Sequence, residues 1–166
     1  DPCDILKATE MQAREESARA VAARDFMLNI FQRADQEKSR GADITASDHH
    51  PLAEAFMRHN TDLNDMAPIP FCRASWGGPD SGIGRFDLVI GADVLYEHDH
   101  PRILAAFLAL HANPTVQFVM ADAGRGHCGR FNAQMQMQGY TRVERRVSFG
   151  GWPPGAGGRI LTYDRT

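Results

Sequence analysis

Apolar and polar positions alternate in distinct blocks along most of this chain. Four short apolar runs have the length and composition of strands, at residues 42–48, 69–74, 86–93 and 116–122. The segments after the first, third and fourth runs predict helices, at residues 51–64, 101–113 and 127–138. Strands that alternate with helices are typical of a mostly parallel sheet with helices on both faces. The run at 86–93 has the pattern of the most buried strand.

The two ends of the chain predict different structures. Segments 141–149 and 159–165 have the pattern of strands, and the glycine- and proline-rich loop between them predicts an antiparallel pair. Residues 4–37 contain neither glycine nor proline and are rich in helix formers, which predicts one long helix or two shorter ones. We therefore expect a helical N-terminal segment over 1–40 and an α/β domain over 41–166, which ends in an antiparallel hairpin.

The composition is that of a globular chain from a reducing compartment. Hydrophobic residues make up 43% of the chain and charged residues 23%, which is ordinary for a soluble domain. No apolar run approaches the roughly 20 residues of a membrane span, and the first residues lack the basic start and apolar core of a signal peptide. Cys3, Cys72 and Cys128 are odd in number and far apart, which argues against a disulfide framework. We expect a cytoplasmic protein without a membrane partner.

Charge is small in total and uneven in distribution. The net charge of −3 does not indicate a nucleic-acid partner. Residues 125–166 nevertheless carry seven arginines and two acids, whereas residues 41–124 carry four arginines and eleven acids. Two interpretations stay open: an ordinary charged surface, or an acidic cleft beside a basic flank.

The segment at 124–129 matches the dinucleotide-binding pattern GxGxxG. It follows a predicted strand and opens a predicted helix, as that motif should. However, it falls at the last crossover of the sheet, and no acidic strand end follows about 20 residues later. We therefore favour a turn that is rich in glycine for structural reasons.

Metal and hydrolase chemistry are weakly supported. Seven histidines are present, with a possible chelate at 98–100 and an adjacent pair at His49 and His50. No HExxH or CxxC pattern accompanies them, so the sequence predicts no metal site. A GxSxG nucleophile elbow is also missing from the sequence, which argues against a serine hydrolase.

Acidic residues end three of the predicted strands, at Asp48, Asp93 and Asp122. In open α/β sheets, ligands bind beyond the carboxyl ends of the strands. A carboxylate at Asp48 could accept hydrogen bonds from both hydroxyls of a ribose. Trp76 could lie against an adenine or could belong to the core. Asp93 and Tyr96 could act on a substrate, or Asp93 could cap the next helix while Tyr96 packs.

Three stretches in this order resemble the class I S-adenosylmethionine-dependent methyltransferases. They are "GADITASDHHP", "RASWG" and "FDLVIGADVLYE", at residues 41–51, 73–77 and 86–97. The third stretch resembles the protein-lysine branch of that family, which carries a DxxY motif. The resemblance implies a Rossmann-like sheet, S-adenosylmethionine as cofactor, and two groups of site residues. The cofactor-binding group is Asp48, His49, Ser75, Trp76, Gly91 and Ala92, and the catalytic pair is Asp93 and Tyr96.

One part of the family pattern is not found in this sequence. Family members carry a first strand and a glycine-rich turn ahead of the strand that corresponds to 42–48. That turn cradles the methionine end of the cofactor, and the strand lies between those at 42–48 and 86–93. Here the preceding residues predict a helix without glycine. Either a segment near 38–41 is omitted from the sequence, or the chain is shorter and another element covers the gap.

We expect an N-methyltransferase that acts on a protein lysine. A carboxylate and a phenol can accept N–H hydrogen bonds from an amine and stabilise the ammonium that develops. One alternative is an enzyme that methylates a small-molecule amine. Another is a binding module that has lost its cofactor and uses the basic hairpin and the N-terminal helix. The N-terminal helix also offers a surface for homo-oligomers.

Overall fold

A computed structural model describes residues 44–148 and 157–166. The helices predicted within residues 4–37, and with them the N-terminal segment, lie outside the described residues. The elements are β1 (Ala46–Asp48), α2 (Ala53–Leu63), β2 (Phe71–Arg73), β3 (Phe86–Ala92), α3 (His100–His111), β4 (Ala112–Asp122), α4 (Cys128–Met137), β5 (Thr141–Ser148) and β6 (Gly157–Arg165). Each element predicted within this range is present. Pro51 was predicted to lie in the first turn of a helix, but α2 begins two residues after it.

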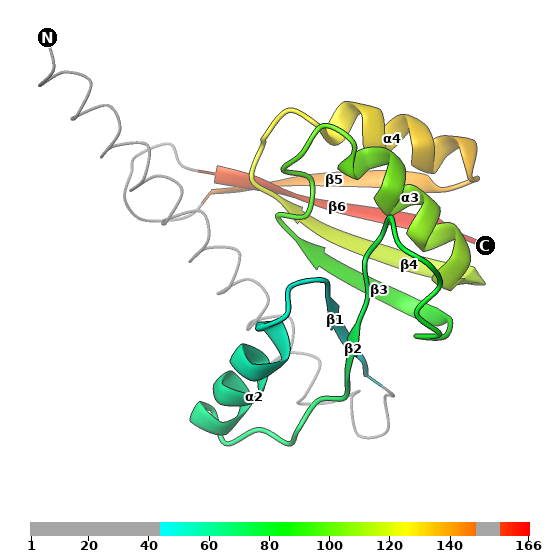
Figure 1. Cartoon of the computed structure of the whole chain (residues 1–166). Helices are drawn as coiled ribbons and strands as arrows, with labels where there is room; N and C mark the ends of the chain where they lie inside the picture. Colours follow the sequence, from blue (N-terminus) through cyan, green and yellow to red (C-terminus); the bar gives the residue numbers. More distant parts are fainter. Residues whose placement is uncertain (1–43, 149–156) are drawn as a thin grey trace, which may run out of the picture.

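The strands form two sheets, which Figure 1 shows one beside the other. β1 and β2 make a parallel pair, with Ala46 opposite Phe71. The larger sheet has the order β3-β4-β6-β5, in which β3 is parallel to β4. β6 runs antiparallel to both of its neighbours. The predicted α/β class, with a parallel core and a C-terminal antiparallel hairpin, is confirmed.

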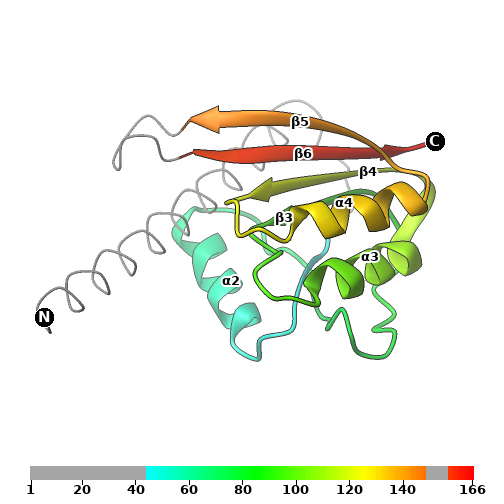
Figure 2. The same cartoon turned by 90° about the horizontal axis from the view of Figure 1, so that it is seen from above.

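β4 is the central support of the larger sheet. Its inward-facing side chains Val116, Phe118 and Met120 are buried. Phe118 lies 5.8 Å, between ring centroids, from both Phe131 of α4 and Tyr163 of β6. Figures 1 and 2 show α3 and α4 side by side against this sheet, whereas α2 lies beside the smaller one. The core therefore holds the larger sheet and its two helices together.

The sequence predicts β3 to be the most buried strand, but the structure shows it partly exposed. It lies at the end of the larger sheet, and Leu88 is 51% exposed. The apolar run predicted full burial because such runs are typical of strands with neighbours on both sides. Among the described residues, however, only β4 pairs with β3. β3 is thus an end strand in the part of the chain that the structure describes, and the further strand expected from the family resemblance stays a prediction.

Candidate functional site

Asp93 stands directly after β3 in an unusual backbone conformation. Its φ is +51°, a left-handed value that few residues other than glycine adopt, although Asp and Asn tolerate it best. Its amide N–H donates a 2.8 Å hydrogen bond to the carbonyl oxygen of Ala121 in β4. The next helix begins at His100 with Asp99 as its N-cap residue. Asp93 therefore does not cap that helix, so the capping part of the structural alternative is wrong.

Arg125, in the loop after β4, binds the carboxylate of Asp93. Its Nε donates to Oδ1 at 2.9 Å and a terminal nitrogen donates to Oδ2 at 2.7 Å. The two side chains are 28% and 18% exposed, respectively, so the pair is shielded from water in part. The sequence did not point to Arg125, because its contact with Asp93 joins residues 32 positions apart.

The glycines of that motif shape the loop around Arg125. Gly124 and Gly126 have φ values of +86° and +89°, which strongly favour glycine. The amide of Gly124 donates to Oδ2 of Asp122 at 3.1 Å. The loop is thus a turn of fixed shape, as the structural interpretation of the motif predicts.

Asp122, the third acid at a strand end, is paired within the protein. It is 4% exposed, and both Nε and a terminal nitrogen of Arg159 in β6 contact its Oδ2. A buried carboxylate needs such a partner because its desolvation is costly. Asp122 therefore fastens β4 to β6 rather than facing a ligand.

Tyr96 is 45% exposed and lies among acidic groups. The pKa of its phenol is raised. Partial burial is the largest cause, and the negative charges of Glu97, Asp48 and Asp93 add to it. The phenol therefore stays protonated at neutral pH and can both donate and accept a hydrogen bond. The charges of both Asp48 and Asp93 contribute to the raised pKa of this phenol, so the ends of β1 and β3 lie within electrostatic range of it.

His100 connects Tyr96 with Trp76. Its ring centroid lies 4.3 Å from that of Tyr96 and 5.4 Å from that of Trp76, both edge to face. The imidazole is buried, and its Nδ1 lies 3.0 Å from the carbonyl oxygen of Val94. Trp76 is half-buried against the core, so its ring can pack on the core and still offer an open face to a ligand. The sequence analysis considered His100 only as a metal ligand.

Asp48 closes β1 with an exposed side chain. Its Oδ1 accepts a 2.7 Å hydrogen bond from the amide of His50, and Nδ1 of His49 lies 3.6 Å from the same oxygen. Its carbonyl oxygen accepts a 3.1 Å bond from the amide of Ala74, which ties the ends of β1 and β2 together. Ser75 follows and is exposed. The carboxylate is thus held at the surface where a polar ligand can reach it.

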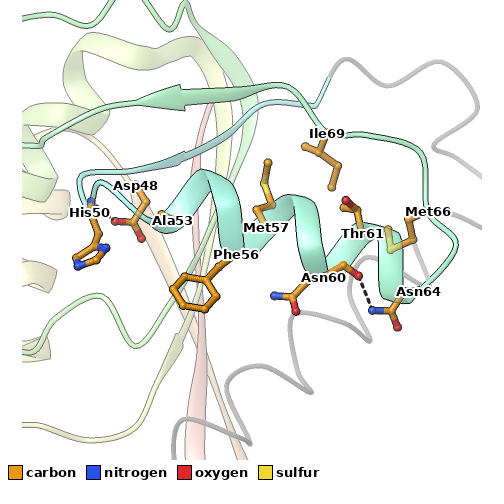
Figure 3. Close-up of a pocket in the computed structure, with 10 residues that line it drawn as sticks. All are labelled: Asp48, His50, Ala53, Phe56, Met57, Asn60, Thr61, Asn64, Met66 and Ile69. Atoms are coloured by element: carbon orange, nitrogen blue, oxygen red, sulfur yellow. Dashed lines mark hydrogen bonds between the residues drawn. The ribbon is translucent and has the colours of Figure 1, made fainter.

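A pocket of about 500 Å³ runs from Asp48 along α2. Figure 3 shows Asp48 and His50 at one end; apolar side chains line the first half of the helix and polar ones line its second half. Of the predicted cofactor residues, the pocket contains Asp48 but not Ser75, Trp76 or Gly91. The pocket therefore covers only one edge of the predicted site.

Gly91 and Ala92 form the last residues of β3. A Cβ at Gly91 would lie 3.3 Å from a methyl group of Val94, so a larger residue would crowd this turn. Ala92 is opposite Ala121 in β4. Val94 and Phe118 fill the space beside Gly91, so the missing side chain serves packing at the end of β3, and the predicted cofactor role of these two residues stays a prediction.

Within 44–148 and 157–166, no group of three or more histidine, cysteine, aspartate or glutamate residues could hold a metal ion. Over the same part of the chain, no helix has the length and apolar character needed to span a membrane.

Solved structures place this fold among methyltransferases. A methyltransferase from Pyrococcus furiosus is similar with a TM-score of 0.58 and 18% identity, over 81% of this chain and 68% of that one. The magnesium protoporphyrin IX methyltransferase of Synechocystis PCC 6803, solved with S-adenosylmethionine, has a TM-score of 0.57 and 15% identity, over 76% and 61%. The N-methyltransferase NodS of Bradyrhizobium japonicum WM9, solved with S-adenosylhomocysteine, has values of 0.51 and 18%, over 73% and 65%.

These likenesses show the fold. No protein-family model and no curated protein matches the chain. The chain spans about two thirds of the length of the three similar proteins, from 61% to 68%. One of the three is named for a porphyrin substrate and another for N-methylation, and a shared fold does not imply a shared function, so the substrate of this chain stays open.

Proposed function

We propose that this protein is an S-adenosylmethionine-dependent N-methyltransferase whose substrate is a protein lysine. The observation that carries the proposal is the grouping of Asp48, Asp93 and Tyr96 at one region of a methyltransferase fold. Two of the similar proteins were solved with S-adenosylmethionine or S-adenosylhomocysteine. The acidic surroundings of Tyr96 favour a substrate that arrives with a positive charge.

The residues present fit the proposed cofactor. Asp48 offers an exposed carboxylate for ribose hydroxyls, and Trp76 offers a half-buried ring for an adenine. The proposed cofactor supplies a methyl group activated by a sulfonium.

The role of the protein is to place an amine in line with that methyl group. Asp93 and Tyr96 stand at the carboxyl end of β3, where each oxygen can accept an N–H bond. The amine attacks in its neutral form and becomes an ammonium. The negative charge of Asp93 stabilises this developing positive charge, while the bonds of both residues orient the lone pair.

We also propose that the complete sheet contains a parallel strand between β1 and β3. Within residues 44–148 and 157–166, β3 has a partner strand on one side only, and its apolar Leu88 is half exposed, which is unfavourable for an edge strand. A strand there would join the two sheets, and its glycine-rich turn would hold the methionine end of the cofactor. The functional tests are therefore best made with the protein encoded by the full native gene.

Transfer of a labelled methyl group tests the substrate class. We expect label from S-adenosylmethionine to enter a lysine-rich peptide but not the same peptide with every lysine replaced by arginine. Label in n-butylamine and not in the peptide would instead support the small-molecule alternative. Absence of transfer together with absence of cofactor binding would support the binding module.

Asp48→Ala should weaken S-adenosylhomocysteine binding by about 1.5–3 kcal/mol, the range for hydrogen bonds to a charged group. The fold should survive because the side chain is exposed and its hydrogen bond to the amide of His50 is local. Calorimetric titration measures the affinity, and Asp62→Ala, an exposed acid within α2, is the matched control. Equal affinity of the Asp48 variant and the parent would remove Asp48 from the cofactor site.

A further inference from the structure

The bond between Arg125 and Asp93 bears directly on the charge of the proposed amine site. It is bidentate, with donor–acceptor distances of 2.9 and 2.7 Å, and it joins the loop after β4 to the end of β3. Asp93 also holds a left-handed backbone and is anchored by its amide to Ala121. Both the backbone and the side chain of this acid are therefore fixed before any substrate arrives.

The loop is built to present Arg125 in this place. Gly124 and Gly126, on either side, have left-handed φ values of +86° and +89°. Asp122 accepts the amide of Gly124 and is itself held by Arg159. The glycine pattern at 124–129 resembles a nucleotide-binding motif but has a local function. It shapes a turn that places the guanidinium of Arg125 beside Asp93.

The charges around Asp93 come from several elements. Glu97 and Tyr96 follow β3, and Asp48 ends β1; both acids act on the Tyr96 phenol. His100 opens α3, with Nε2 3.5 Å from a carboxylate oxygen of Glu97. Farther along, His98 is contacted by Arg130 of α4, and Asp122 of β4 pairs with Arg159 of β6.

Charge at this site decides the protonation of an amine substrate. A lysine amine has an ordinary pKa of about 10.4 and is mostly an ammonium at neutral pH. A carboxylate within about 4–6 Å favours the ammonium, by about one to three pKa units. An unpaired Asp93 would therefore hold the substrate in the form that cannot accept a methyl group.

We propose that Arg125 is a positioning residue that neutralises Asp93 and so lets the bound amine lose its proton before methyl transfer. This inference rests on the proposed function. Each carboxylate oxygen of Asp93 can still accept an N–H bond alongside its bond to Arg125, because it has more than one lone pair. The pair can therefore orient the amine without trapping it as an ammonium.

The pH dependence of kcat tests this inference, because its acidic limb reports the pKa of the amine in the enzyme–substrate complex. With the lysine-rich peptide, Arg125→Gln leaves one negative charge and should move that limb to higher pH by about one unit. Asp93→Asn leaves one positive charge and should move it to lower pH. The double variant restores neutrality, so its limb should return to the position of the parent.

An equilibrium measurement gives a second readout that does not depend on turnover. n-Butylammonium, a mimic of the lysine side chain, is titrated at neutral pH and followed by the NMR signals of Tyr96. Arg125→Gln should bind it about tenfold more tightly, corresponding to one pKa unit. Arg125→Lys, which keeps the charge, should stay close to the parent.

The outcomes separate the two proposals. One outcome is that all variants bind the cofactor and transfer methyl, with coincident acidic limbs and equal butylammonium affinities. This outcome would overturn the role of Arg125 and leave the proposed function intact. A fall of kcat in Arg125→Gln without a shift of its limb would likewise reduce Arg125 to a structural support. A parent that neither binds the cofactor nor transfers methyl would overturn both.

Discussion

Asp93→Asn should lower methyl transfer by about 10²-fold or more, the scale for a lost electrostatic or acid–base group. The substitution keeps the shape of the side chain but leaves the positive charge of Arg125 uncompensated beside the developing ammonium. The left-handed backbone of Asp93, with φ of +51°, is tolerated by Asn as well as by Asp. The loss should therefore appear in kcat, while the melting temperature and the affinity for S-adenosylhomocysteine change little.

Asp65 provides a matched control for this substitution. It is exposed in the turn after α2 and also has a positive φ, of +50°. Asp65→Asn makes the same chemical change in the same backbone conformation, far along the chain from the proposed substrate residues. It should retain the kcat of the parent. Parental turnover by Asp93→Asn on a confirmed substrate would exclude the proposed role of the carboxylate.

Phe131→Ala should destabilise the protein by about 3–5 kcal/mol, the range for removing a large aromatic side chain from a core. Phe131 is fully buried. Its ring lies 5.8 Å from that of Phe118 and 5.4 Å from that of Tyr163. The substitution leaves a cavity between α4 and two central strands, and it also removes two edge-to-face ring contacts. Denaturant-induced unfolding measures the loss in free energy. The dependence of that free energy on denaturant concentration is compared between the variant and the parent.

Met137, on the same helix, is the control for that change. It is 81% exposed, so Met137→Ala should alter the free energy of unfolding by less than about 0.5 kcal/mol. Similar losses in the two variants would mean that α4 does not pack against the sheet as described.

The order of strands and helices could be predicted because each element carries its own periodicity. The C-terminal hairpin is the clearest case, since two strand-like segments flank a loop of glycine and proline. Antiparallel pairing of β5 with β6 confirms it, with Thr141 opposite Asp164. The exposure of Leu88 could not be predicted, because the composition of a strand does not tell which neighbours are present beside it.

The positions of the site residues at strand ends could be predicted, but the contacts between their side chains could not. Asp48 and Asp93 follow from the rule that ligands bind beyond the carboxyl ends of parallel strands. Arg125 lies 32 positions after Asp93, and only the parallel pairing of β3 with β4 brings the two side chains together. His100 was equally hidden, because its ring contacts depend on how α3 begins. The roles of all these residues, and lysine as the substrate, stay predictions.

Calorimetric titration of S-adenosylhomocysteine into the protein encoded by the full native gene tests the central claim most directly. The account predicts one-to-one binding, with the product of methyl transfer held at the ends of β1 and β3 and with unchanged affinity in Asp93→Asn. Titrations at millimolar ligand that show no binding at two temperatures would contradict the account. The second temperature is needed because binding with an enthalpy close to zero gives no heat at the first.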